Sequence, residues 1–191
     1  MPAGPARVLP RAGLLALAVS KGVNWIVLEG SESGGHVGAM STLTLAQAAL
    51  MARKREPERF AGVGFILAGG IGDRRGARWA AILGADAVQL GTAYLATAEI
   101  VATGALSPLY QQLVVTAGPA ATVVSGHATG LRVRALRTPK MAAIRATECE
   151  YRRKGGDEAE FRRRLEALGA GSLLIAARGV RSPDGKRLPE A

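Results

Sequence analysis

Apolar residues in the first half of the chain fall into short continuous runs, and glycine follows each run before a helical pattern begins. The runs are continuous rather than alternating, which predicts strands that are buried on both faces. The three predicted strands cover residues 23–28, 63–68 and 85–90. The helical patterns cover residues 11–21, 42–55, 74–83 and 93–101. Because strand, glycine-containing loop and helix recur three times, we expect parallel strands joined by right-handed crossovers.

Local end signals mark the boundaries of two of these helices. Ser41 or Thr42 can cap the helix that runs to about Arg55, where a cluster of basic residues suits the negative end of the helix dipole. Asp73 is placed to cap the next helix, and Gly84 is placed to end it. These signals predict two well-defined helices between the three strands.

The second half of the chain has a weaker pattern. A helix is expected over residues 107–117, a strand over 122–125, a turn over 126–130, an alternating segment over 131–136, helices over 139–168 with a break at 155–156, and a short final helix over 170–177. The first ten residues contain three prolines and are expected to be flexible. The predicted divisions are a partial barrel at 1–138, a helical extension at 139–180 and a disordered tail at 181–191.

Composition narrows the class of protein. The 191 residues are 48% hydrophobic but only 4% aromatic, so small aliphatic residues must pack the core. The single cysteine, Cys149, excludes an internal disulfide and favours a cytoplasmic location. No apolar stretch reaches the roughly 18 residues of a membrane helix. The apolar stretch at residues 14–19 follows two arginines, but it is too short for a signal peptide.

The net charge of +10 raises the question of nucleic-acid binding. Most basic residues after Gly130 are mixed with acidic ones, which is typical of a solvated helix surface. Stacking aromatics are not interleaved with the basic residues. We therefore expect a small-molecule substrate, and neither a nucleic acid nor a membrane as partner.

The loop after the first predicted strand carries the main candidate for chemistry. Residues 29–38 contain four glycines and His36, which is one of two histidines in the chain. Glycines allow close approach of the backbone to a ligand, and parallel sheets bind ligands at the carboxyl ends of their strands. His36 is therefore a candidate for proton transfer, with Glu29 and Glu32 available to orient it or to accept hydrogen bonds from a ligand. Alternatively, His36 is a loop residue bonded to a backbone carbonyl.

Two further glycine loops follow the next two strands. Gly69-Gly70 and Gly91-Thr92 are a matched pair at strand ends, which favours a phosphate site built from backbone N–H groups and the Thr92 hydroxyl. The alternative is that these glycines only let helices approach strands. The spacing of histidine and cysteine offers no metal site, and Asp86 is interpreted as a residue at the start of a strand.

Three ordered motifs make the chain resemble the nitronate monooxygenase (2-nitropropane dioxygenase) family. They lie at residues 29–38, 67–71 and 88–95. The resemblance implies an α/β fold of the (β/α)8 TIM-barrel type, FMN as cofactor and His36 as the catalytic residue. It further implies that the cofactor-binding residues are Glu29, Gly34, Gly35, Gly69, Gly70, Gln89, Leu90, Gly91 and Thr92, with Glu29 and Gly34 near the flavin ring and the later residues mainly at the phosphate.

The same motifs also resemble flavin-dependent enoyl-acyl-carrier-protein reductases and flavin domains of polyketide and fatty-acid synthases. The turn at residues 126–129 is similar to those synthase-linked members in particular. A full barrel needs about 250 residues, whereas about three strand–helix units with carboxyl-terminal helices are expected here. The chain is therefore expected to be a truncated product, a piece of a longer reading frame, or a subunit whose barrel a second copy or another chain completes.

Three functions follow from this sequence. The first is an FMN-dependent oxidoreductase that oxidises alkyl nitronates with oxygen. The second is an enoyl-reductase-like component of fatty-acid or polyketide synthesis that uses a nicotinamide donor. The third is an inactive partial barrel that acts as a phosphate-binding or assembly module.

Overall fold

The computed structural model describes residues 6–9, 12–118 and 120–170. Contacts divide the chain into two compact units, Met1–Ala93 and Tyr94–Ala191. Only Ala170 of the predicted final helix at 170–177 is described, and the tail at 181–191 lies outside the described residues. The predicted boundaries after residues 138 and 180 stay predictions.

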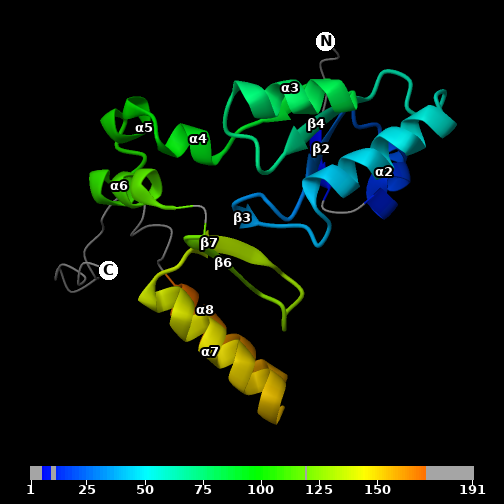
Figure 1. The fold of residues 1–191 in the computed structure, drawn as a ribbon. Coiled ribbons are helices and arrows are strands. Elements are labelled where there is room, and N and C mark those ends of the chain that lie inside the picture. The colour runs from blue at the N-terminus through cyan, green and yellow to red at the C-terminus, as the bar shows by residue number, and fades with distance from the viewer. Residues whose placement is uncertain (1–5, 10–11, 119, 171–191) are drawn as a thin grey trace. The chain divides into compact units, whose positions relative to one another are not determined.

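The first unit is built on a four-stranded parallel sheet (Figure 1). Its strands are β1 (Ala6–Leu9), β2 (Trp25–Glu29), β4 (Gly64–Ala68) and β5 (Ala87–Gln89), in the order β1-β2-β4-β5. The three predicted strands are confirmed as parallel neighbours. The pairing of Trp25 with Gly64 brings the indole over the glycine, and a Cβ atom at position 64 would collide with that ring.

Strand β1 corrects the expectation of a flexible start for residues 6–9, while residues 1–5 and 10 lie outside the described residues. Residues 6–9 pair with β2, with Ala6 opposite Trp25 and Leu9 opposite Leu28. Pro5 and Pro10 flank these four residues in the sequence rather than interrupting them, so each residue of the strand keeps a backbone N–H for pairing. The abundance of proline was therefore misleading, because it marks the ends of a short edge strand.

The helices of the first unit pack apolar side chains against one face of the sheet. They are the 3-10 turn η1 (Ala12–Leu14), α1 (Leu15–Ser20), α2 (Thr42–Arg55) and α3 (Arg74–Leu83). The fully buried core includes Ile26, Leu28, Phe65 and Leu67 from β2 and β4, and Leu45 from α2. Burial of each such side chain contributes about 1.5–3 kcal/mol.

The predicted ends of α2 and α3 are confirmed. Ser41 Oγ accepts a hydrogen bond from the Thr44 N–H at 3.1 Å, and Asp73 Oδ1 accepts one from the Gly76 N–H at 2.9 Å. Gly84 ends α3 in the left-handed region with φ of 95°. These caps fix the two helices against the strands that they connect.

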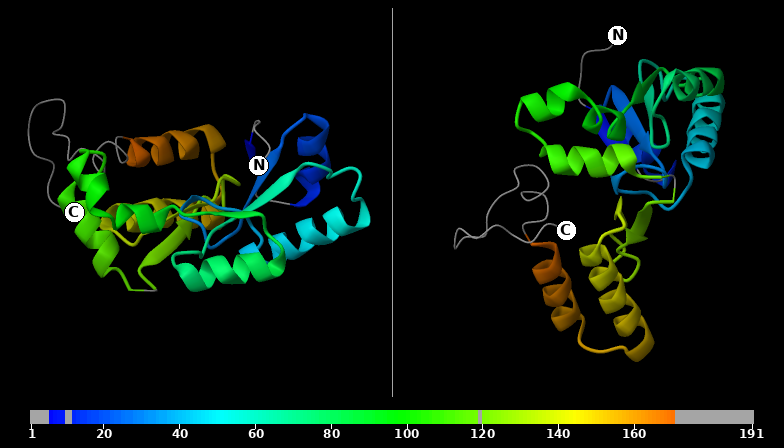
Figure 2. Two further views of the ribbon diagram at one scale, coloured as in Figure 1. Left: turned by 90° about the horizontal axis from the view of Figure 1, so that it is seen from above. Right: turned by 60° about the vertical axis from the view of Figure 1, so that its left-hand side comes forward.

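The second unit contains short helices, a β-hairpin and a helical pair. Its elements are α5 (Ala98–Ala102), α6 (Pro108–Thr116), β6 (Thr122–Ser125), β7 (Val133–Leu136), α7 (Pro139–Lys154) and α8 (Glu158–Gly169), while α4 (Thr92–Leu95) spans the division. Strands β6 and β7 are antiparallel. Helices α7 and α8 lie side by side (Figure 2), and the Tyr151 ring stacks on Phe161 with centroids 4.0 Å apart.

One predicted helix of the second half is broken. The pattern over residues 93–101 forms α4 and α5 rather than a single helix. Thr97 Oγ1 donates a hydrogen bond to the Tyr94 carbonyl at 2.8 Å, and this local bond competes with continuation of the helix.

Among the described residues, no helix combines the length and apolar character needed to cross a bilayer.

Candidate functional site

Three strands of the first unit end level with one another. Glu29 at the end of β2 pairs with Ala68 at the end of β4, and Ala68 pairs with Gln89 at the end of β5. Because residues that pair across neighbouring strands point to the same face of a sheet, Glu29 and Gln89 lie on the same face, on either side of Ala68. The three loops that follow these strands therefore begin at one edge, where parallel sheets bind their ligands.

The glycine-rich loop after β2 closes on itself and on helix α2. The Ser31 N–H donates to the Met40 carbonyl at 2.8 Å, which joins the two ends of the loop. Glu32 Oε2 accepts hydrogen bonds from the Thr42 N–H at 2.7 Å and from Thr42 Oγ1 at 2.8 Å. Glu32 was a candidate to orient His36 or bind a ligand, but in this structure its carboxylate holds the loop against the first turn of α2.

These hydrogen bonds change the pKa of Glu32. Partial burial acts to raise the pKa, but hydrogen bonds from Thr42 and Ser31 to the carboxylate outweigh it and lower the pKa below its usual value. The carboxylate also lies at the amino end of α2, where the helix dipole favours a negative charge. Glu32 therefore holds the loop most firmly when it is ionised.

Glycines let the three loops approach one another closely. A Cβ atom at Gly69 would lie 2.5 Å from Ser33 Oγ, and φ of Gly69 is +105°, so no other residue fits there without a shift. A Cβ atom at Gly70 would lie 3.3 Å from the Glu32 Cβ atom. A Cβ atom at Gly34 would lie 3.7 Å from Thr92 Oγ1, an ordinary contact that shows only that the two loops are neighbours. The structure thus brings residues of the Gly34, Gly69 and Thr92 loops together.

His36 and Glu29 lie close enough for their charges to interact. His36 is exposed in the short strand β3 (Gly35–His36), and Glu29 is half-buried at the end of β2. Burial raises the pKa of Glu29, while the charge of His36 acts to lower it. Among the described residues, the His36 imidazole makes no hydrogen bond to a backbone carbonyl, which the alternative interpretation requires.

The remaining predicted residues lie on or next to the same edge. Gln89 and Gly91 are exposed, and Leu90 packs against the core of the first unit. Sequence reasoning missed Ser33, whose hydroxyl is buried without a partner, and it treated Thr42 only as a helix cap. Both roles depend on how the loop closes, and the residue pattern contains no signal for that.

The second unit holds one buried carboxylate of its own. Glu148 of α7 is 4% exposed and accepts a hydrogen bond from the Gly126 N–H at 2.5 Å. Gly126 has φ of +81°, and a Cβ atom there would collide with the Leu131 carbonyl. Glu148 thus fixes the start of the turn at residues 126–130, on which His127 is exposed.

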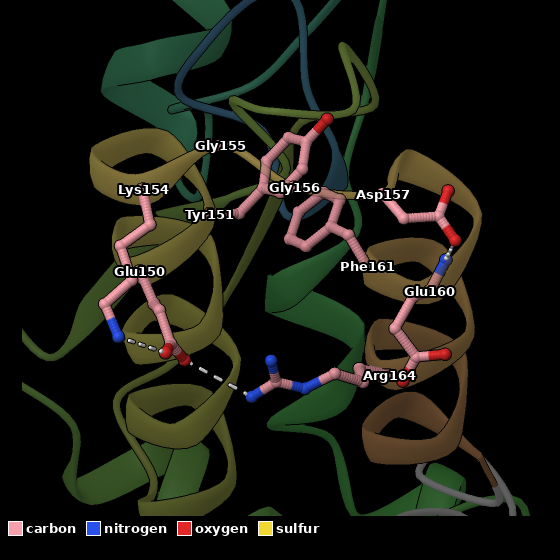
Figure 3. A pocket seen from close by; sticks show the side chains of 9 residues that line it. All are labelled: Glu150, Tyr151, Lys154, Gly155, Gly156, Asp157, Glu160, Phe161 and Arg164. Atoms are coloured by element: carbon pink, nitrogen blue, oxygen red, sulfur yellow. Dashed lines mark hydrogen bonds and ion pairs between the residues drawn. The ribbon is translucent and has the colours of Figure 1, made fainter.

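A shallow pocket lies between α7 and α8 (Figure 3), but its charges are already paired. Glu150 forms ion pairs with Lys154 at 3.1 Å and with Arg164 at 3.4 Å. Asp157 accepts hydrogen bonds from the first N–H groups of α8, and Glu160 pairs with Arg163. The pocket is therefore a feature of the helical pair, and it offers no unpaired charge to a ligand.

Comparisons with known proteins support the family and the barrel fold. A family model described as nitronate monooxygenase matches residues 12–168. A probable nitronate monooxygenase of Bacillus subtilis is 34% identical over 121 residues, which cover 63% of this chain and 34% of that protein. The chain thus spans about a third of the length of the curated relatives that it matches.

Solved structures show the same fold. FabK from Thermotoga maritima superposes with a TM-score of 0.69 and 31% identity, over 91% of this chain and 49% of that one. A nitroalkane oxidase from Streptomyces ansochromogenes superposes with a TM-score of 0.50 and 23% identity, over 70% of this chain and 38% of that one. The fold is of the (β/α)8-barrel type, and the chain covers about half of the barrel.

Proposed function

The chain belongs to the nitronate monooxygenase family, and we propose that it forms the catalytic part of an FMN-dependent oxidoreductase that oxidises alkyl nitronates with oxygen. The observation that carries the proposal is the level ending of β2, β4 and β5. Their glycine loops come together beside Thr92, and the His36 charge acts on Glu29. An anion site and a proton-transfer group would thus lie at one edge of the sheet.

The residues at this edge fit FMN. Enzymes of this family depend on FMN. Gly34 lies next to Thr92, 3.7 Å from its Oγ1 atom as measured to a Cβ atom placed at Gly34, so the loops after β2 and β5 are neighbours at this edge. The Gly69, Gly70 and Gly91 backbone and the Thr92 hydroxyl would hold the phosphate. Glu29, Gly34, Gly35, Gln89 and Leu90 would contact the rest of the cofactor.

Bound FMN would supply the electron acceptor for the reaction. His36 is exposed at the edge, so a substrate can reach it, and its imidazole would accept the α-proton of a neutral nitroalkane to give the nitronate that is then oxidised. An ionised Glu29 would stabilise the protonated imidazole through the same charge interaction that acts on the pKa of Glu29. The closed loop, tied to Thr42 by Glu32, would hold His36 in position.

Flavin absorbance and turnover of the His36→Ala variant test this function. The variant is expected to keep bound FMN and to lose about 10²–10⁴-fold in oxidation of a neutral nitroalkane, whose α-proton must be removed, the usual contribution of a positioned acid or base. Gly72→Ala is a matched control, because a Cβ atom there meets nothing within 4 Å. Unchanged oxidation of the neutral nitroalkane by a flavin-loaded His36→Ala protein would show that the proposed role of His36 is wrong.

A second candidate is an enoyl-reductase-like component of fatty-acid or polyketide synthesis. The broad superposition on FabK, over 91% of this chain, is the observation that favours it. This function requires NAD(P)H to reduce the flavin and an enoyl thioester to reoxidise it. NAD(P)H consumption that depends on the thioester, without nitronate oxidation, would select this candidate. Weak FMN binding with neither activity would instead support a non-enzymatic phosphate-binding module.

A further inference from the structure

The hydroxyl of Ser33 is buried without a hydrogen-bond partner. Ser33 is 5% exposed, and its Oγ atom is the one buried side-chain polar atom left unsatisfied in the described part of the chain. A buried hydroxyl without a partner has lost its hydrogen bonds to water and forms none in the folded protein, so it destabilises the unliganded protein. Such groups are rare in folded proteins and each needs an explanation.

The neighbours of Ser33 do not supply this partner. The closest groups around Gly69 are Ser33 Oγ and Thr42 Oγ1. The single proton of Thr42 Oγ1 is shared instead between Glu32 Oε2 at 2.8 Å and the Ala68 carbonyl at 3.3 Å. The Ser33 N–H is also engaged, with the Gly30 carbonyl at 3.3 Å, so the residue is held in place while its hydroxyl remains unpaired.

Ser33 lies where the three glycine loops meet. Its hydroxyl faces Gly69, and the next residue, Gly34, faces Thr92 Oγ1. The loops at Gly69-Gly70 and Gly91-Thr92 are those to which the proposed function assigns the phosphate of the cofactor. A phosphate is a strong acceptor, and a hydroxyl that donates to a charged oxygen forms a stronger bond than one between neutral groups.

We propose that the Ser33 hydroxyl donates a hydrogen bond to the phosphate monoester of bound FMN, which rests on the proposed function. A small shift of the loop opens Ser33 Oγ to the ligand, and Gly34 and Gly35 on its carboxyl side give the backbone the freedom to make it. Binding then converts an unsatisfied hydroxyl into a charge-assisted hydrogen bond. Ser33 is therefore a residue that selects the phosphorylated flavin.

The test compares FMN with riboflavin, which lacks the phosphate. Dissociation constants are measured by flavin fluorescence for the wild type and Ser33→Ala, together with the melting temperature of each flavin-free protein. Ser33→Ala is expected to bind FMN about tenfold or more weakly, to bind riboflavin unchanged, and to melt no lower than the wild type. Ser31→Ala is a matched control in the same loop, since Ser31 Oγ already donates to Glu32 Oε2 at 3.3 Å. It should change FMN affinity by less than about twofold.

Four outcomes would overturn the proposal. FMN affinity that is unchanged in Ser33→Ala would show that the hydroxyl is simply tolerated in the core. An equal loss of FMN and riboflavin affinity, or a lower melting temperature, would show that Ser33 only shapes the loop. A wild-type protein that binds neither flavin would contradict the proposed function as well, so the two failures are distinguishable.

Discussion

The Oε2 atom of Glu32 accepts hydrogen bonds from both the backbone N–H and the hydroxyl of Thr42, at 2.7 and 2.8 Å. One carboxylate therefore joins the glycine-rich loop to the first turn of α2. The same loop carries His36 and Ser33, whose positions depend on its closure. The anchoring of the loop is thus an electrostatic interaction that acidity can weaken.

We expect acid to weaken this anchor in the wild type. Glu32→Gln should remove this part of the pH dependence of stability. The pKa of Glu32 is lowered in the folded protein, so its contribution to stability is present above the unfolded-state pKa and is lost as pH falls through the folded-state pKa. The variant should be about 1 kcal/mol less stable at neutral pH, because the carboxylate is largely exposed and solvent screens it. Urea unfolding between about pH 2 and pH 7 measures the difference, which should shrink in acid. Glu58→Gln, an exposed change just after α2, is the control, and an equal pH dependence in both variants would contradict the prediction.

Glu29 should show the opposite pH dependence. Burial raises the pKa of Glu29, so its contribution to stability is full below the unfolded-state pKa and is lost as pH rises through the folded-state pKa. Glu29→Gln should abolish this loss and leave the urea midpoint flatter across mildly acidic pH. Because the His36 charge acts to lower the pKa of Glu29, His36→Ala should raise that pKa further. NMR titration of the Glu29 carboxyl carbon checks the second point, and a downward shift would refute it.

Gly69→Ala should destabilise the protein much more than Gly72→Ala. A methyl group at position 69 would meet Ser33 Oγ at 2.5 Å with φ at +105°, whereas one at position 72 meets nothing within 4 Å. Overpacking and backbone strain together predict a loss of about 2–4 kcal/mol for Gly69→Ala and a near-neutral effect for Gly72→Ala. Equilibrium unfolding measures the stability of the two variants. Equal stabilities would mean that the loops do not meet as described.

Asp86 is expected to stabilise the sheet rather than to take part in chemistry. Its Oδ2 atom accepts the Phe65 N–H at 2.8 Å and pairs with Arg53 at 2.6 Å. Asp86→Ala should cost about 1–3 kcal/mol, because the Phe65 N–H loses its acceptor. The side chains of Arg53 and Asp86 are 29% and 41% exposed, so a double-mutant cycle with Arg53→Met should give a coupling of only about 0.5–1 kcal/mol. If Asp86→Ala lowered the rate of nitroalkane oxidation without lowering stability, Asp86 would have a role in the chemistry instead.

Glu148→Ala should weaken the second unit. The buried carboxylate is the acceptor for the Gly126 N–H, and its removal leaves that donor unsatisfied next to a cavity. We expect a loss of about 2–4 kcal/mol, with a smaller loss for Glu148→Gln, which keeps an acceptor oxygen. Hydrogen exchange of the Gly126 amide is the direct measurement, and protection that survives in Glu148→Ala would contradict the assignment.

The sequence predicted what local signals determine. Ser41, Asp73 and Gly84 cap their helices through atoms that lie within a few residues, so both ends of α3 could be expected from the sequence. Strand β1 could not, since a parallel partner is distant along the chain and residues 6–9 have no pattern that requires one. The short helices α4 and α5 were merged because the bond from Thr97 to Tyr94 depends on a single hydroxyl.

The candidate site likewise has features that could be predicted from the sequence and features that could not. The glycines and His36 could be singled out because they stand at the ends of apolar runs, and chain order alone placed their loops at one edge. The level ending of Glu29, Ala68 and Gln89 required the strand register, which the sequence does not specify. The partnership of Glu32 with Thr42 and the burial of Ser33 required a closed loop, which depends on tertiary contacts.

The indole of Trp25 over Gly64 has a practical consequence. The chain contains two tryptophans, and only this one reaches across from β2 to a neighbouring strand at a position that cannot carry a side chain. Separation of β2 from β4 would expose the ring to water and shift its emission to longer wavelength. The protein thus carries an intrinsic fluorescent reporter of its central strand pair, and a Trp79→Phe background would isolate that signal in stopped-flow refolding.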